Sequence, residues 1–175
     1  MCQSRRSQTG VNLVELMIVV AILAISLTLG VPGFQSLKLR SDRSAALIEL
    51  VAAVSLARSE AAQRGTPVSV CASSDGVACS GNSDWTGGWL VFHDADRDLA
   101  VAAQADVIKV VRFEHVRFSI TADEDIAGGI TFGTFGFSTP TAGGLTYTDA
   151  LAARAINLTY VGRLHVTEAT VEPSS

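Results

Sequence analysis

The strongest constraint in this chain is an uncharged run of 22 residues, at positions 16–37. A helix rises about 1.5 Å per residue, so about 20 residues span the roughly 30 Å hydrocarbon core of a bilayer. We therefore expect a transmembrane segment over about residues 14–34. Glu15 lies at the start of this run, where a carboxylate is costly unless a cation pairs with it. The alternative is that the Glu15 side chain reaches back to the membrane interface without a partner.

The residues before the run have the wrong order for a cleaved secretory signal peptide. In such a peptide the small residue at the cut follows the apolar region. Here the polar, basic segment MCQSRRSQTG comes first, and Gly10 precedes the apolar residues. Cleavage after Gly10 would therefore leave the apolar helix attached to the mature protein.

The segment GVNLVELMIVVAILAI resembles the N-terminal signature of type IV pilin-like proteins, with Gly and Glu in register before an aliphatic run. The resemblance implies that residues 1–10 are a leader peptide, that a prepilin peptidase cuts after Gly10, and that Val11 becomes the N-methylated first residue. Most pilin-like proteins have Phe and Thr where this chain has Val11 and Asn12. Glu15 would then lie about one helical turn from the new amine. Its expected role is in assembly, where it pairs with the amine of a neighbouring subunit.

The same resemblance implies a location and partners. The leader would lie in the cytoplasm, the helix would cross the bacterial inner membrane once, and the C-terminal domain would lie in the periplasm. Other pilin or pseudopilin subunits are expected to bind through the N-terminal helix, giving a pilus or pseudopilus. Pro32 removes one helical hydrogen bond, so we expect a kink there.

Residues 37–64 have the periodicity of an amphipathic helix, and Gly65 follows as a stop signal. With the preceding run, this predicts one long helix over residues 11–64. The apolar residues recur at intervals of three and four and define the face that we expect to be buried: Leu47, Leu50, Val51, Val54, Ala57 and Ala61.

After Gly65 the pattern changes to short β-like runs separated by Gly, Asp and Ser. One helix followed by strands predicts an α+β fold of type IV pilin-like architecture, in which the second half of the helix packs on an antiparallel β-sheet. We therefore expect a β-rich domain over residues 65–175. The candidate strands lie at residues 67–72, 89–94, 107–113, 116–121, 129–133, 154–160 and 163–168.

Cys71 and Cys79 enclose the seven residues ASSDGVA, a loop that can bring two Cβ atoms together. In an oxidising compartment a disulfide is the favoured interpretation. The alternatives are two unlinked buried thiols, or a metal site, which two cysteines without a nearby third ligand would form poorly.

Three further segments resemble the GspH/FimT family of minor pilins and pseudopilins: LARSEAAQRGTPVSVC, CSGNSDWTGGWLVFHDADRD and RAINLTYVGRL. The similarity covers nearly the whole chain, and the segment from Trp85 to Trp89 is its most distinctive part. Trp89 and Phe92 are expected to supply core area. The resemblance implies a minor pilin-like structural subunit at or near the tip of a type IV pilus, acting in pilus assembly, twitching or DNA uptake. The helix end and the cysteine pair favour the FimT/FimU branch, and a type II secretion pseudopilin is the alternative.

Nothing in the sequence indicates an enzyme. The histidines at 93, 115 and 165 are scattered, and neither an HExxH motif nor a serine nucleophile motif is present. The acidic run DADRD begins like a calcium-binding loop, but Leu99 and Ala105 stand where that loop needs Gly and Glu. We therefore expect an acidic turn, with no catalytic residue, metal or cofactor.

DNA is a second alternative partner. The chain has 13 Lys and Arg against 17 Asp and Glu, a net charge of -4, which does not favour nucleic acid overall. Some FimT proteins are linked to DNA uptake through a C-terminal segment resembling Gly-Arg-x-Arg. Gly162 and Arg163 match that segment, and His165 replaces the second arginine. Contacts are therefore expected at Arg163 and His165, with Arg154 on the same face if their strands pair.

Overall fold

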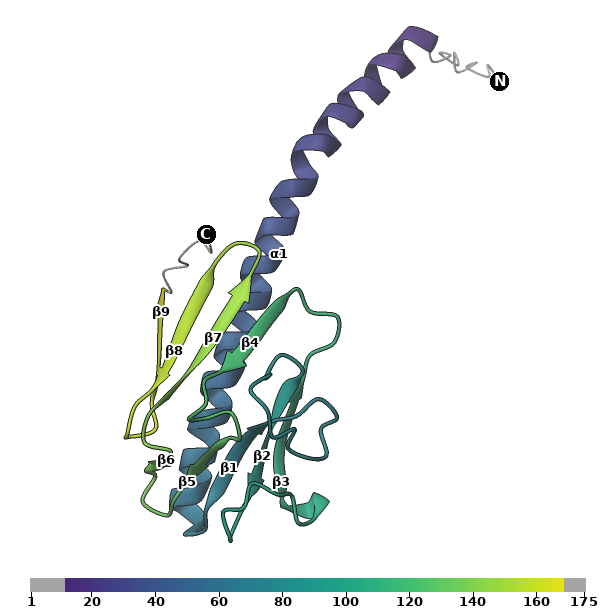
Figure 1. Cartoon of the computed structure of the whole chain (residues 1–175). Helices are drawn as coiled ribbons and strands as arrows, with labels where there is room; N and C mark the ends of the chain where they lie inside the picture. The colour runs from purple at the N-terminus through teal and green to yellow at the C-terminus, as the bar shows by residue number, and fades with distance from the viewer. Residues whose placement is uncertain (1–11, 169–175) are drawn as a thin grey trace, which may run out of the picture. The chain divides into compact units, whose positions relative to one another are not determined.

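The computed structural model describes residues 12–168, except for the side chains of residues 27–33. Figure 1 shows its elements, of which the longest is helix α1 (Leu13–Arg64). The chain divides into two compact units between Lys38 and Leu39, and each is considered by itself. The first half of α1 belongs to one unit, and its second half belongs to the other together with all the strands.

The predicted long helix is confirmed over the described residues. Asn12 caps its start, where the Asn12 Oδ1 accepts a hydrogen bond from the Val14 N–H at 3.3 Å. Gly65 ends it with a φ of 67°, a left-handed conformation that suits glycine, and its N–H donates to the Ala61 carbonyl at 3.0 Å. Pro32 lies within α1. Because its side chain is outside the described set, the kink stays a prediction.

Two antiparallel sheets follow the helix in the described chain. The first has the order β3-β2-β1-β5-β6 and comprises β1 (Val68–Ala72), β2 (Gly88–His93), β3 (Val107–Arg112), β5 (Ile130–Phe132) and β6 (Ser138–Thr139). The second has the order β4-β7-β8-β9 and comprises β4 (Phe118–Ala122), β7 (Gly143–Asp149), β8 (Ala153–Leu158) and β9 (Leu164–Glu168). A short 3-10 helix, η1 (Gln104–Asp106), precedes β3.

All seven predicted strands are present, with ends that differ by at most two residues. The structure adds β6 and β7, which the sequence analysis did not predict. β7 begins with two glycines and alternates Thr with larger residues, so it has no continuous apolar run. β6 has only two residues. Both strands form because hydrogen-bonded neighbours, β5 for β6 and β4 and β8 for β7, supply what local propensity does not.

One face of α1 is completely buried in the domain core: Ala46, Leu50, Ala53, Val54, Ala57 and Ala61 are each at most 1% exposed. Leu50, Val54, Ala57 and Ala61 were expected there. The prediction was wrong for Leu47 and Val51, which are only half-buried, while Ala46 and Ala53 extend the buried face on its other side. The predicted face was centred on the large apolar residues because alanine is only weakly apolar. The prediction therefore placed the buried face of α1 too far toward Leu47 and Val51.

A row of aromatic rings joins the two sheets. Trp89 in β2 contacts Phe113, Phe113 contacts Phe118 in β4, and Phe118 stacks on Tyr147 in β7, with ring centroids 5.3, 5.4 and 5.1 Å apart. Trp89 is fully buried in the main core, as expected. Phe92 is also buried, but in a separate small cluster. The row therefore provides the aromatic core area on which both sheets meet.

Cys71 and Cys79 form a disulfide with a Cα–Cα distance of 5.6 Å, so the favoured interpretation is confirmed. Both cysteines pack in the same small cluster as Phe92. In the enclosed loop, the Asp75 carboxylate accepts hydrogen bonds from the N–H groups of Val77 and Ala78. These hydrogen bonds lower the pKa of Asp75 below its ordinary value, and the bond from Val77 contributes most.

A buried ion pair ties α1 to the second sheet. Arg43 donates two hydrogen bonds to Asp149, from Nε at 2.8 Å and from Nη2 at 2.7 Å, and the Asp149 side chain is fully buried. The N–H groups of Leu151 and Ala152 also donate to it. Burial acts to raise the pKa of Asp149, but the hydrogen bonds from Arg43 and from the two N–H groups outweigh it and leave the pKa lowered.

We predict that Asp149→Asn destabilises the protein by about 3 to 5 kcal/mol at pH 7, because Arg43 is left without its counter-charge. A lowered pKa contributes stability that is present above the unfolded value of about 3.9 and is lost as pH falls through the folded value. Wild type should therefore lose stability steeply below about pH 4, and the variant less so. Urea unfolding at pH 7 and pH 3.5 measures both effects. The exposed Glu114→Gln is the control, and equal stability of wild type and Asp149→Asn at pH 7 would contradict the prediction.

Candidate functional site

The first part of α1 exposes apolar side chains on every side. Ten large apolar residues between positions 13 and 25 are each 50 to 74% exposed: Leu13, Val14, Leu16, Met17, Ile18, Val19, Val20, Ile22, Leu23 and Ile25. With 3.6 residues per turn, such a run leaves no polar face on the helix. Apolar surface of this extent marks contact with a membrane or with other protein chains.

Glu15 is the one charged residue in positions 12–26. It is exposed in the first turn of α1, where a negative charge is favoured by the helix dipole. No ion pair joins it to another residue of the described segment 12–168. The geometry therefore leaves the carboxylate accessible to a cation from outside the chain.

Several predictions concern residues that the structure does not describe. Gly10 and Val11, the expected cleavage and methylation positions, lie before residue 12. Among the described residues, no helix combines the length and the apolarity that crossing a membrane requires. The expected span at about 14–34 includes residues 27–33, whose side chains are not described.

The acidic run after β2 forms a turn, as expected. Asp94 is buried and its carboxylate accepts hydrogen bonds from the Ser69 Oγ at 2.5 Å and from the N–H groups of Asp98 and Leu99. Carboxylate oxygens of Asp94, Asp96 and Asp98 lie within 4.8 Å of one another. Asp94 therefore has a structural role, because its carboxylate ties the turn to Ser69 of β1.

The C-terminal hairpin of β8 and β9 separates the three expected DNA contacts. Cross-strand partners point to the same side of a sheet, and the exposed His165 is paired with the exposed Asn157. The Thr159 N–H donates to the Arg163 carbonyl, so the pairing continues to Arg163, which is two residues from His165 and shares its exposed outer face. Arg154 lies on the opposite face, beside Tyr147, and its guanidinium pairs with Glu168 at 3.0 Å. The strands do pair, but alternation keeps Arg154 away from the other two residues.

Three exposed aromatic residues, which the sequence analysis did not single out, lie at two hairpin tips. Phe135 and Phe137, between β5 and β6, are 86% and 57% exposed, and Tyr160, between β8 and β9, is 66% exposed. The sequence does indicate the turn, though not the exposure of the rings. Phe135 and Phe137 stand in the segment GTFGF, where closely spaced glycines favour a turn over a strand.

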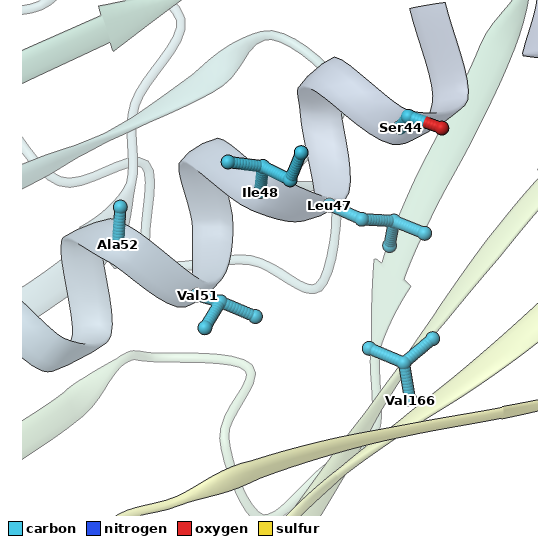
Figure 2. A pocket seen from close by; sticks show the side chains of 6 residues that line it. All are labelled: Ser44, Leu47, Ile48, Val51, Ala52 and Val166. Atoms are coloured by element: carbon cyan, nitrogen blue, oxygen red, sulfur yellow. The ribbon is translucent and has the colours of Figure 1, made fainter. Parts of the chain in front are cut away.

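An open apolar groove of about 510 Å³ runs beside α1 in the domain. Figure 2 shows its lining, with Leu47 and Val51 of the helix facing Val166 of β9. Ser44, Ile48 and Ala52 complete it. β9 is an edge strand of the second sheet. This location explains why Leu47 and Val51 are only half-buried, since the described sheet ends at β9 and leaves this flank of α1 open.

Comparison with known proteins agrees with this fold. A family model described as "Type II transport protein GspH" matches residues 46–162, which is more than half of the 175 residues. No curated protein matches the sequence.

Two crystal structures of the type IV minor pilin FimU from Pseudomonas aeruginosa strain PAO1 are similar to the chain. The form in space group P21 has a TM-score of 0.52 at 20% identity and covers 73% of this chain and 90% of that chain. The form in space group P65 has a TM-score of 0.49 at 20% identity, with 71% and 91% covered. At this identity the P21 likeness shows the fold alone, a long helix packed on antiparallel sheets.

The family is one of structural, pilin-like proteins and not of enzymes. Its model spans α1 from Ala46 onward, the first sheet, and strands β4, β7 and β8 of the second sheet, and it ends before Arg163 and β9. The chain therefore belongs to the GspH family of pilin-like proteins.

Proposed function

We propose that this chain is a minor pilin-like subunit of a type IV pilus, incorporated at or near its tip, where it acts in pilus assembly, twitching or DNA uptake. One observation carries the proposal: residues 13–26 form a helix that is apolar on all sides and bears a single accessible carboxylate, Glu15, at its start. Such a helix is suited to a bilayer before assembly and to a bundle of similar helices in the assembled filament.

In this proposal, a prepilin peptidase removes residues 1–10 in the bacterial inner membrane and Val11 is methylated. The chain crosses that membrane once, with its domain in the periplasm. A carboxylate in apolar surroundings gains most when it is paired with a cation. Glu15 would therefore pair with the terminal amine of an adjacent subunit and set the register of helix packing.

A minor pseudopilin of a type II secretion system is the alternative, since the same helix would serve a pseudopilus equally well. Deleting the chain separates the two systems. Loss of twitching motility with normal protein secretion supports the pilus role, whereas the reverse result assigns the chain to secretion.

Processing is the first testable consequence. Mass spectrometry of the chain from sheared filaments should find an N-terminus at Val11, heavier by one methyl group. A peptidase-deficient strain is the control, in which residues 1–10 should remain. An intact leader in mature filaments, or a cut on the far side of the apolar run, would contradict the proposal.

The second consequence concerns Glu15. Glu15→Ala should insert into the membrane normally but enter filaments poorly, because the pairing charge is gone. Losing a charged hydrogen bond of about 1.5 to 3 kcal/mol corresponds to a roughly ten- to 150-fold fall in incorporation. Immunoblots of sheared filaments against membranes measure the ratio, with the exposed Glu114→Ala as matched control. Wild-type incorporation of Glu15→Ala would show that the carboxylate has no assembly role.

DNA binding is a second candidate function, supported by the shared exposed face of Arg163 and His165. Contacts to the phosphates of duplex DNA should be few and salt-dependent. We predict that Arg163→Ala weakens duplex binding and reduces the slope of log affinity against log salt by about one. Fluorescence anisotropy over 50 to 200 mM salt tests this, with Arg154→Ala as the control on the other face. An unchanged salt slope in Arg163→Ala would remove this site.

A further inference from the structure

We infer that the two adjacent hairpin tips form a stacking platform for single-stranded nucleic acid, with Phe135, Phe137 and Tyr160 as the stacking residues. This inference refines the ligand class of the second candidate function and does not depend on the filament role. It adds three aromatic residues, at tips 133–137 and 159–163, to the basic residues Arg163 and His165.

The rings are held on closed, hydrogen-bonded turns. In the first tip, Gly133 N–H donates to the Phe137 carbonyl at 3.0 Å and Gly136 N–H donates to the Gly133 carbonyl at 2.8 Å. In the second, Thr159 N–H donates to the Arg163 carbonyl at 2.9 Å. A rigid presentation reduces the conformational entropy lost when a ligand binds. The backbone that carries each exposed ring is therefore ordered before a ligand binds.

The two tips lie side by side although they belong to different sheets. The Ser138 Oγ, next to Phe137, donates a hydrogen bond to the Thr159 carbonyl, next to Tyr160, at 3.4 Å. Gly162 packs so closely on Phe132 that a Cβ on Gly162 would stand 2.4 Å from the phenyl ring. Figure 1 shows the β5–β6 hairpin beside the turn that joins β8 to β9. The segments that carry the three rings are thus adjacent.

The charge at this surface is positive in an otherwise acidic chain. Segments 133–139 and 159–165 contain no Asp or Glu, and the second contains Arg163 and His165. Arg58 of α1 lies under the first tip, where a Cβ on Gly136 would stand 3.2 Å from its Nε. A Cβ on Gly133 would stand 3.6 Å from the Arg97 Nη2. The charge of Arg97 is offset by its sequence neighbours Asp96 and Asp98. A polyanion is therefore favoured here.

Aromatic rings and arginines together match unpaired nucleotides. Bases in a single strand expose their faces and stack on aromatic side chains, while the phosphates contact cations. In a duplex those faces are stacked on one another and are not available. The three protruding rings consequently favour a single strand, whereas a set of cations alone would not distinguish it from a duplex.

The test uses the full chain in detergent and fluorescence anisotropy with labelled dT15 and a 15-base-pair duplex at 50 mM salt. We expect dT15 to bind at least about tenfold more tightly than the duplex. Phe135→Ala and Tyr160→Ala should each weaken dT15 binding roughly five- to a hundredfold. Tyr160→Phe keeps the ring and should bind like wild type. Val77→Ala, which truncates an exposed apolar residue elsewhere, should have no effect.

Three results would overturn the inference: equal affinity for dT15 and duplex, undiminished dT15 binding in both ring variants, or binding of phosphatidylglycerol vesicles through these rings without dT15 binding. Because Phe135 and Tyr160 are exposed, their truncation leaves the core intact, and unchanged thermal unfolding verifies this. Loss of duplex binding in Arg163→Ala with no dT15 binding in wild type would retain the second candidate function and reject the stacking platform. If dT15 binding depends on the rings and the duplex does not bind, the stacking platform is retained and duplex binding at Arg163 is rejected.

Discussion

The burial of one face of α1 between Ala46 and Ala61 is the contact on which the domain depends. Four of the six fully buried residues on this face are alanines, so the helix backbone lies close to the elements that cover it. The large side chains of the core, such as Trp85, Trp89 and Phe132, come from the β-rich segment instead. Small residues on the helix and large ones opposite allow the close packing that protein interiors require. The buried Arg43–Asp149 pair then fixes the helix to the second sheet at a defined position along its length.

The two sheets contact each other at several places in the described chain, and two of these contacts bear on the site. At the first, the aromatic row from Trp89 to Tyr147 joins β2 to β7. At the second, Gly162 packs on Phe132, and its φ of 70° together with this close approach excludes a larger residue. The family resemblance assigned Gly162 to a possible DNA motif, whereas its contacts give it a packing role. That same packing brings the hairpin tips together.

The parts of the fold that depend on local pattern could be predicted from the sequence. The long helix, seven strands and the Cys71–Cys79 bridge follow from apolar periodicity, turn residues and spacing. Contacts between distant segments could not be predicted. Arg43 and Asp149 are 106 residues apart, and no local pattern pairs them. β7 was missed because its glycines obscure the alternation that β4 and β8 stabilise through pairing.

The candidate sites follow the same division. Glu15 could be recognised from the sequence as a candidate site, because a carboxylate beside an apolar run is costly unless a cation pairs with it. The position of Arg154 required the strand register, which places it opposite Glu168 and away from Arg163. The aromatic tips required exposure values, because a Phe between glycines gives no sign from sequence alone of whether it folds inward.

The exposure of those aromatic residues is not explained by folding. The chain has only seven Phe, two Trp and two Tyr, and burying a Phe side chain stabilises a protein by roughly 1.5 to 3 kcal/mol. Phe135, Phe137 and Tyr160 forgo much of that gain, and polar residues would suit both turns without exposing apolar surface. The tips close through backbone hydrogen bonds and through the packing of Gly162 on Phe132, none of which involves the rings of Phe135, Phe137 or Tyr160. Stability therefore depends on residues beneath the tips, and the rings can serve a ligand without any part in holding the fold.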